Sequence, residues 1–437
     1  MESEFAALAA LLGHDAARLA AGEEITSYLT VANAHDARRV FSRASPAQRS
    51  ARQASFYQPA IAARARLGQG LHDRGEAFAF ADEPLDPADR HALERHFPAH
   101  VKAISVAEKR LAPGERWDVS VRGAAWGIDD MEELYVVVNV GRLVLGPGAE
   151  VLVRGNVLSL FCEELVSEGA GGAVPRIAVL PTPFSLDGRR GAAHDGGHGS
   201  PGTPGTRGRD AEPLATEPTM IGPRLRAPLD RALLDGSDGT AGTAGGRGGD
   251  GRNGGMCKLA EITVRALAGE LAVFAQAGRG GDGGDGGDGG EGGGGGCGAD
   301  GVTVVGGIVQ PGRSGDGGRG GAGGRGGNAG HGGVSSNVYV SVPAEAESRV
   351  RCIALASEGG SAGRGGRGGR GGAAGETPRP GRNAPPASEH ARHGEPGTDG
   401  APGVTGRGRP APVIFLNERP HGGSDLDPAT TQERLVL

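Results

Sequence analysis

Large aromatic side chains are scarce in this sequence and almost absent from its second half. Phe, Tyr and Trp make up 4% of the 437 residues, and after Phe184 only Phe274, Tyr339 and Phe415 follow. A chain of this length would ordinarily hold two or three domains, each with its own apolar core. The second half therefore cannot form a core of the usual globular kind.

The sequence also lacks segments that would place the chain in or across a membrane. No apolar run approaches the ~20 residues that a membrane span needs. The start, Met1 to Phe5, has no basic stretch followed by an apolar one, so no secretory signal is recognised. We therefore expect a protein that is cytoplasmic or exported by a signal-independent route. The net charge of -6 gives no reason to expect a nucleic-acid partner.

The sequence also has no closely spaced cysteine pair and no nucleotide-binding loop. The four cysteines are widely spaced and form no Cys-x-x-Cys pair, which argues against a zinc site: Cys162, Cys257, Cys297 and Cys352. A disulfide such as Cys257 to Cys297 fits this spacing, and so do free thiols, which are the default without a secretory signal. No Gly-x-x-x-x-Gly-Lys-Ser/Thr loop is present, so we expect neither a GTPase nor a bound cofactor.

Glycine is abundant, with 85 residues, and much of it recurs at intervals of three. From Gly278 the chain repeats glycine triplets to about Cys297, with one variable residue in each triplet. Six runs show the three-residue period, and they begin at Gly196, Gly236, Gly278, Gly312, Gly360 and Gly394. No ordinary helix, strand or coil predicts so regular a spacing.

A period of three matches the polyproline-II helix, which has three residues per turn, rises about 3.1 Å per residue and has no internal hydrogen bonds. Where the residue on one edge is always glycine, a neighbouring backbone approaches closely enough to bond with it. We therefore predict a bundle of about six such helices, each roughly 45–65 Å long. Flexible linkers are the alternative. The constant register and the short β-branched stretches between the runs favour the bundle.

Charged residues fill the middle positions of the triplets and form rows with a pitch of about 9 Å per turn. One run carries an acidic row and another a basic row, and we predict that the two lie side by side or flank a run of mixed charge. Simple solvation is the alternative, because exposed ion pairs contribute only about 0–1 kcal/mol. The predicted binding faces are Asp282, Asp285, Asp288 and Glu291 in the acidic row, Arg313, Arg319 and Arg325 in the mixed run, and Arg364, Arg367 and Arg370 in the basic row.

The N-terminal region, residues 1–103, is predicted to be α-helical. Ser3 is a candidate N-cap for a first helix, and Asp86 followed by Pro87 opens a short later one. Residues 35–67 are rich in arginine. This stretch fits an anionic partner or, more simply, a helix face that docks on acidic parts of the same chain.

From about Ile104 the apolar period changes to that of strands. Short β-branched runs such as Tyr135 to Val140 follow one another, separated by turn signals such as Gly146-Pro147-Gly148. They fit a small sheet or the stacked coils of a β-solenoid, and the solenoid is favoured because a strand run recurs before each glycine run. We predict this base over 104–187, the bundle with interleaved strands over 188–408, and a C-terminal strand and tail over 409–437.

The sequence gives only weak signals for a metal site or a catalytic site. His194, Asp195 and His198 fit a metal site, but histidines in a glycine loop are more often exposed and unliganded, so no metal is predicted. A carboxylate cluster precedes a strand and consists of Asp129, Asp130, Glu132 and Glu133. This cluster fits either general acid–base chemistry on a sugar or a polar turn, and the turn is favoured.

Two runs resemble the glycine runs of known groups: Gly281-Asp282-Gly283-Gly284-Asp285-Gly286-Gly287 and the run from Gly318 to Asn328. One group is the snow-flea antifreeze protein, a bundle of six polyproline-II rods. The other is the glycine-rich N-terminal domain of Obg-type GTPases, which bundles six such helices on a β-base. The resemblance covers about half the chain and implies a fold rather than an activity. Arg and Asp occupy positions that are small and uncharged on the ice-binding face of the first group.

The sequence thus predicts a mainly β protein, in which a solenoid or sheet carries a glycine-rich polyproline-II bundle behind a helical N-terminal region. We expect a non-enzymatic structural or adhesive protein whose bundle binds a protein or polysaccharide surface, or another copy. A β-helix-type polysaccharide-active enzyme using carboxylates near Asp129 is one alternative, and an ice- or surface-binding protein is another. A pair of carboxylates about 5–10 Å apart in a groove would favour the enzyme.

Overall fold

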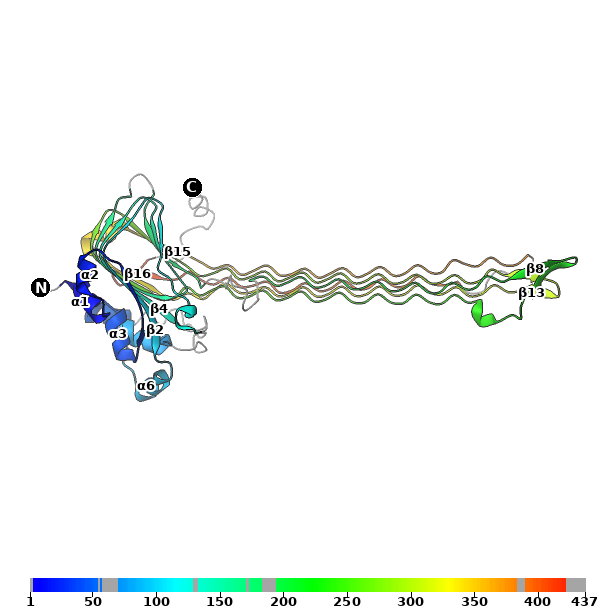
Figure 1. Ribbon diagram of the computed structural model, residues 1–437, viewed down its shortest axis with the longest axis horizontal. Coiled ribbons are helices and arrows are strands. Elements are labelled where there is room, and N and C mark those ends of the chain that lie inside the picture. The colour runs from blue at the N-terminus through cyan, green and yellow to red at the C-terminus, as the bar shows by residue number, and fades with distance from the viewer. Residues whose placement is uncertain are drawn as a thin grey trace.

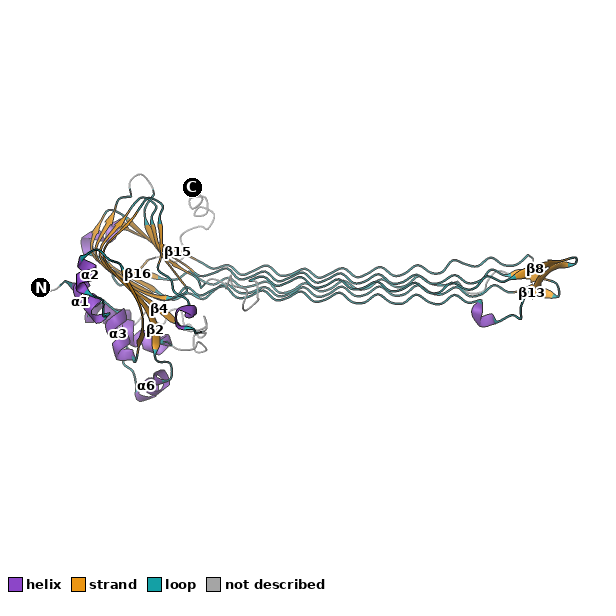
Figure 2. Ribbon diagram, in the orientation of Figure 1, coloured by secondary structure: helices purple, strands orange, loops and turns teal. Residues whose placement is uncertain are grey.

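The chain forms a broad head from which a long, thin stalk projects, and a small tip ends the stalk (Figure 1). This computed structural model describes residues 3–53, 56, 70–128, 133–169, 173–182, 194–382 and 390–421. Helices and strands lie in the head and the tip, whereas the stalk between them has neither (Figure 2).

The elements have the following bounds. The helices are α1 (Glu4–Leu11), α2 (Ala16–Ala20), α3 (Ala34–Phe41), α4 (Pro46–Arg52), α5 (His72–Ala81), α6 (Pro87–Glu94) and the 3-10 turns η2 (Gly123–Trp126), η3 (Arg231–Leu233) and η4 (Ala344–Arg349). The strands of the head are β1 (Ile25–Val31), β2 (Ala99–Leu111), β3 (Arg116–Asp118), β4 (Leu134–Leu145), β5 (Glu150–Arg154), β6 (Val157–Ser167), β7 (Arg176–Leu180), β10 (Ala260–Ala268), β11 (Leu271–Gln276), β14 (Val338–Ser341), β15 (Val350–Leu355), β16 (Ile414–Leu416) and β17 (Arg419–His421). Those of the tip are β8 (Thr216–Thr219), β9 (Gly222–Leu225), β12 (Val302–Val304) and β13 (Gly307–Val309).

Two sheets face each other in the head. The larger has the strand order β1-β2-β4-β6-β10-β14-β16-β17, and the smaller has the order β15-β11-β7-β5-β3. The strands pair in parallel except at the edges of the larger sheet, where β1 and β17 are antiparallel to their neighbours. From β2 to β16 the strands of the head alternate between the two sheets in chain order. The prediction of a mainly β protein is confirmed.

Apolar side chains fill the space between the sheets. In β4, Val136 and Val138 belong to the core between the sheets, whereas Tyr135 and Val137 belong to the cluster on the outer face. A parallel strand that is buried on both faces needs an unbroken apolar run, which explains the stretch that begins β4. Full burial of each such side chain contributes about 1.5–3 kcal/mol.

The N-terminal helices cover the outer face of the larger sheet (Figure 1). Phe41 of α3 stacks on Tyr135 of β4, with ring centroids 4.6 Å apart. Tyr339 of β14 stacks on Phe415 of β16, with centroids 5.2 Å apart. Phe274 lies in β11 of the smaller sheet. The few aromatic residues of the second half therefore all lie in head strands, and the stalk has none.

Local signals at helix starts are confirmed, but the α-helical region predicted over 1–103 is interrupted by a strand and ends at β2. Ser3 Oγ accepts the N–H of Ala6 at 3.2 Å in front of α1. Asp86 caps α6, with proline at the first helical position. Residues 25–31 instead form β1, which is rich in β-branched side chains and pairs antiparallel with β2. Tertiary pairing thus places a strand between two helices.

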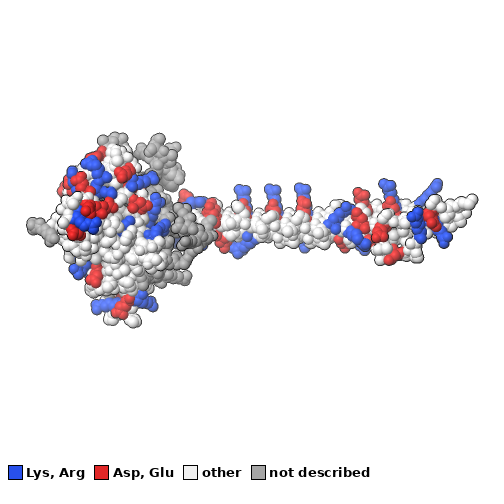
Figure 3. Space-filling view, viewed as in Figure 1, with Lys and Arg blue, Asp and Glu red and all other residues white. Residues whose placement is uncertain are grey.

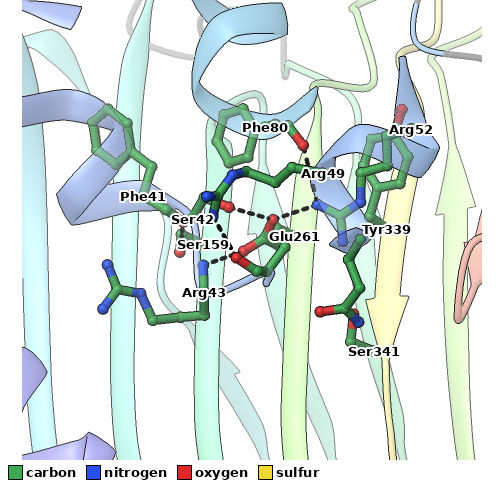
Figure 4. Close-up of polar contacts among 12 residues, drawn as sticks. Phe41, Ser42, Arg43, Arg49, Arg52, Phe80, Ser159, Glu261, Tyr339 and Ser341 are labelled. Carbon is green, nitrogen blue, oxygen red and sulfur yellow. Dashed lines mark hydrogen bonds and ion pairs between the residues drawn. The ribbon is translucent and has the colours of Figure 1, made fainter. Parts of the chain in front are cut away.

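A buried ion cluster joins the helices to the larger sheet (Figure 4). Glu261 of β10 accepts hydrogen bonds from Ser42 Oγ at 3.0 Å and from Arg43 N at 2.5 Å. Its Oε2 also pairs with Arg52 Nη1 of α4 at 2.5 Å. Arginines of the stretch 35–67 therefore dock on an acidic residue of the same chain. Residues 54–55 and 57–67 of that stretch lie outside the described residues.

Arg52 extends this cluster to the C-terminal hairpin. Its Nε and Nη2 donate to the Glu418 carboxylate at 2.9 and 3.0 Å, and its guanidinium lies 4.4 Å from the ring centre of Tyr339. Burial alone would lower the pKa of Arg52, but the Glu261 and Glu418 carboxylates more than offset it, so the pKa is raised. One guanidinium thus ties α4 to β10 and to the turn between β16 and β17.

Six extended segments form the stalk. We number them segment I (194–211), II (235–256), III (278–301), IV (312–334), V (357–379) and VI (392–409). Segments I, III and V leave the head after β7, β11 and β15, and segments II, IV and VI return to β10, β14 and β16. Each outward and return pair is thus inserted between a strand of the smaller sheet and the next strand of the larger one.

Backbone hydrogen bonds join the segments laterally. In segment III, Gly290 N donates to Thr243 O of segment II at 2.9 Å, and Gly289 N donates to Arg367 O of segment V at 2.8 Å. Equivalent bonds recur every three residues. Segments adjacent in order run antiparallel, and segments two apart run parallel. Segments I, III and V therefore form one layer, and segments II, IV and VI form the other. Segments III and IV lie in the middle of their layers, and each bonds to four neighbouring segments.

The closeness of these contacts explains the glycines. A Cβ at Gly290 would lie 2.0 Å from Thr203 O, and one at Gly321 would lie 1.9 Å from Thr243 O. A Cβ at Gly294, in a middle position, would meet nothing closer than 3.6 Å. Side chains are thus excluded from the contact positions and admitted at the middle ones.

The tip consists of two hairpins, β8–β9 and β12–β13. Val305 N donates to Pro223 O at 2.8 Å and joins the hairpins. Beneath them Leu234, Ala299 and Val309 form a small buried apolar cluster. The tip therefore has its own core, far from the core of the head (Figure 1).

Candidate binding surfaces on the stalk

The predicted acidic row lies on segment III, and most of its carboxylates bind backbone amides. Asp285 Oδ1 accepts the N–H of Arg364 at 2.7 Å, and Asp288 Oδ1 accepts that of Arg367 at 2.7 Å. Both amides belong to segment V. In segment V the amide of the first glycine of each triplet donates to a neighbouring backbone, as Gly363 N does to Gly327 O at 3.0 Å. The amides of the middle residues have no backbone acceptor among the described residues, and the carboxylates of segment III take that place. The acidic row is therefore first of all structural.

Asp282 shows the electrostatic consequence of this arrangement. Its Oδ1 accepts the backbone N–H of Ser361 at 2.6 Å and a bond from Arg279 Nη2 at 2.7 Å. The Ser361 amide, followed by the Arg279 guanidinium, lowers the pKa of Asp282. Glu291, with one more methylene, makes no equivalent bond in the part of the chain that the structure describes.

The predicted basic row lies on segment V, directly beside segment III. The prediction that the two runs are neighbours is confirmed by bonds such as Gly286 N to Arg364 O at 2.8 Å. Pairing between the charges is wrong, because the carboxylates bind amides. Arg364, Arg367 and Arg370 are exposed, and their guanidinium groups have no carboxylate partner among the described residues. Figure 3 shows Lys and Arg side chains standing out from the stalk at regular intervals.

The mixed run lies on segment IV, in the other layer. Arg319 lies 4.0 Å from the Glu395 carboxylate of segment VI, and both side chains are largely exposed. Arg313 and Arg325 occupy other middle positions of the same segment. Asp316 Oδ1 accepts the N–H of Arg392 at 2.8 Å. The structure therefore divides the predicted binding residues between two layers.

The histidine and carboxylate candidates have structural roles where they are described. His198 Nδ1 accepts the N–H of Asp285 at 3.1 Å, and Asp195 Oδ1 accepts that of Asp282 at 2.8 Å. His194 also lies in segment I. The described residues contain no group of three or more His, Cys, Asp or Glu side chains placed to hold a metal ion.

The proposed acid–base cluster is not a groove site as far as it is described. Glu133 is buried, pairs with Lys258 at 3.1 Å and accepts the hydroxyl of Tyr135 at 2.8 Å. The other members, Asp129, Asp130 and Glu132, lie outside the described residues. None of the four cysteines, all of which are described, forms a disulfide, so the bridge from Cys257 to Cys297 is excluded.

Two surfaces were missed from the sequence. One is the apolar tip, where Met220 and Ile221 are almost fully exposed. The other is an uncharged edge between segments I and II, where Thr203 Oγ1 lies 3.0 Å from Thr243 Oγ1. The sequence held a signal for each surface. The signal for the tip was a Met-Ile pair within a Pro- and Gly-rich connection. The signal for the uncharged edge was the presence of threonines in the middle positions of facing runs.

No family model, curated protein or solved structure matches this chain. Among the described residues no helix combines the length and the apolarity that crossing a bilayer requires.

Proposed function

We propose that the chain is a non-enzymatic adhesive protein, in which a β-solenoid head carries a stiff bundle of polyproline-II helices and the bundle binds an acidic polysaccharide. The observation that carries this proposal is the row of Arg364, Arg367 and Arg370 on segment V. These guanidinium groups are exposed, recur every three residues and have no carboxylate partner in the described chain.

The hydrogen-bond pattern of the stalk supports the polyproline-II assignment. Extended backbones that bond to neighbours at a three-residue interval, with glycine at the contacts, have the properties of that helix. The alternation of strands between two facing parallel sheets supports the solenoid assignment, because each turn of such a coil adds one strand to each sheet.

The arginine row fits an extended anionic polymer. Polyproline-II geometry spaces its members by about 9 Å per turn. A guanidinium group offers a planar fork of donors that matches carboxylate or sulfate oxygens. The stalk holds the three guanidinium groups in line before any polymer binds. Several contacts therefore form along one polymer chain without the entropic cost of ordering the protein backbone. The neighbouring Asp285 and Asp288 compete weakly, since each already accepts an amide.

Binding of a polyuronate, a sulfated polysaccharide and a neutral glucan tests the proposal. The triple variant Arg364→Gln, Arg367→Gln, Arg370→Gln should bind the acidic polymers about 10- to 100-fold more weakly at about 50 mM salt, from three contacts of up to ~1 kcal/mol each. Higher salt should weaken the wild type in the same direction.

Three other stalk arginines provide the matched control. Arg207, Arg247 and Arg279 each pair with an aspartate three residues later at 2.7–2.9 Å. Their joint change to Gln should leave the affinity unchanged. Equal binding of the neutral glucan, or undiminished binding by the triple variant of segment V, would reject the proposal.

A second candidate, ice or surface binding, is favoured by the uncharged threonine edge. Thr206 Oγ1 lies 3.0 Å from Thr240 Oγ1, and this pair repeats that of Thr203 and Thr243 one turn away. Ice-crystal shaping by the wild type that Thr206→Lys removes would support this candidate. Unshaped crystals in the wild-type solution would reject it.

A further inference from the structure

The far end of the stalk presents aliphatic side chains to solvent. Met220 and Ile221, in the turn between β8 and β9, are 105% and 80% exposed. Val305 and Ile308, in the adjoining hairpin, are 41% and 42% exposed. In Figure 3 the outermost surface of the tip carries no Lys, Arg, Asp or Glu, and charges of both signs begin directly behind it. A contiguous exposed apolar surface at such a position marks an interaction site.

The exposed aliphatic residues are not needed to hold the tip together. The hairpins rest on the separate cluster of Leu234, Ala299 and Val309. The Val305 amide, rather than its side chain, joins the hairpins through its bond to Pro223 O. The aliphatic side chains at the apex are therefore free to be substituted without loss of the fold beneath them.

We propose that the tip docks on a lipid bilayer, with Met220, Ile221 and Val305 entering the apolar side of the interface. The apex is convex and is formed by two narrow turns, so a protein partner would need a pocket that encloses both. A bilayer needs no such complementary shape, because its interface accepts any protruding apolar group and stabilises it in proportion to the area buried. The insertion is peripheral and involves no membrane-spanning segment.

Charges behind the apex suit the headgroup region. Arg224 of β9 and Arg226 are exposed, and neither has a carboxylate partner among the described residues. Glu217 lies opposite Arg224 in the hairpin register. Arginines beside an apolar surface extend to lipid headgroups while the apolar side chains lie deeper. Charges of both signs behind the apex match zwitterionic headgroups, so binding should not depend on anionic lipid.

Flotation of the full chain with phosphatidylcholine vesicles at about 150 mM salt tests the proposal. The wild type should float with the vesicles. The variant Met220→Ser, Ile221→Ser, Val305→Ser should bind at least tenfold more weakly, because the apolar area that enters the bilayer is gone. Val404→Ser is the matched control, since Val404 is 60% exposed but lies on segment VI, away from the tip. It should bind as the wild type does.

A reporter at the apex gives an independent measurement. Ile221→Trp should show a blue-shifted emission and quenching by brominated lipid, and Val404→Trp should show neither. Wild-type protein that stays unbound, or a triple serine variant that floats equally well, overturns the proposal. Capture by protein-coated beads that the serine variant loses, with no vesicle binding, would assign the tip to a protein partner and also overturn it. The variant Arg364→Gln, Arg367→Gln, Arg370→Gln should float normally, which separates this inference from polysaccharide binding.

Discussion

The head and the stalk hold extended chains together by opposite means. In the head, strands bury side chains such as Val138 and Leu160 between two sheets. In the stalk, glycines such as Gly290 have no side chain at the contact, and backbone amides bond directly to neighbouring carbonyl groups. The head therefore tolerates changes of side chain at constant volume, whereas the stalk tolerates almost none at its contact positions. The middle positions of the stalk remain free to carry charge.

The largest effect is expected in the head. Arg52→Met leaves Glu261 buried without its guanidinium, and breaking a buried pair of this kind costs about 3–5 kcal/mol. Both tryptophans, Trp117 and Trp126, lie in the head, so urea unfolding followed by tryptophan emission reports on it. Arg18→Met is the control, because its pair with Glu23 is half-exposed and contributes at most about 1 kcal/mol. Equal stability of the two variants would contradict the assigned role of the buried cluster.

A methyl group in the stalk should have the next largest effect. Gly290→Ala places Cβ 2.0 Å from a carbonyl oxygen, and separating the segments to relieve the clash should cost about 2–3 kcal/mol. Gly294→Ala, in a middle position, has room. Calorimetry should therefore show a lower stalk transition for the first variant alone, with the tryptophan transition of the head unchanged. A stalk that accepts both changes would mean that its segments are not in close contact.

Removing a carboxylate that accepts a backbone amide should cost less. Asp282→Ala leaves the Ser361 amide without its acceptor, at a cost of about 1 kcal/mol. Asp282→Asn keeps a carbonyl oxygen at the same place and should retain most of the stability. A loss that is equal in the two variants would point to charge, rather than the hydrogen bond, as the source.

The same carboxylates predict how the stalk responds to acid. Backbone amides, of Ser361 for Asp282 and of Asn328 for Asp250, lower the pKa of these residues below its ordinary value of 3.8. Their contribution is therefore present above that value and is lost as pH falls through the lowered folded-state pKa. The stalk transition should fall below about pH 4, where these carboxylates are protonated. Changing Asp250 and Asp282 to Asn should flatten this dependence.

The smallest effect on stability is expected for the arginine row. Changing Arg364, Arg367 and Arg370 to Gln should shift the stalk by less than about 0.5 kcal/mol, because these groups have no carboxylate partner and are solvated. The same variant should lose polysaccharide binding. A large drop in the melting temperature would instead show that the two charged rows pair in solution.

Much of the stalk was predictable because its period is unusually regular. The starts of the six runs followed from spacing alone. The acidic and basic runs were predicted from their charges and equal pitch to lie side by side or to flank the mixed run, and the first arrangement is the one found. The amide-binding role of Asp285 did not, because it depends on which backbone positions remain unpaired after the segments have met. The strand β1 was not predicted because its pairing with β2 is a tertiary contact. The exposed apex at Met220 was not predicted because two exposed residues give no periodic signal.

The number of glycines per triplet also distinguishes the outermost segments from those with more neighbours. Segment III has two glycines in most triplets, as in Gly283-Gly284-Asp285, and bonds to four neighbours. Segment I has one, as in Gly202-Thr203-Pro204, and bonds to two. Segment V also has two glycines in most triplets, as in Gly363-Arg364-Gly365, and bonds to three neighbours. Counting glycines in this way separates segments I and VI, at the two ends of the layers, from segments III, IV and V.

Hydrogen exchange of the amides in segment III tests most directly whether backbone bonds hold the stalk together. Gly289 and Gly290, which donate to segments V and II, should exchange at least ~1,000-fold more slowly than in an unstructured chain. The amide of Glu291, which has no acceptor in the described chain, should exchange fast. Rapid exchange at all three residues, in protein whose head remains folded, would contradict this role of the backbone bonds.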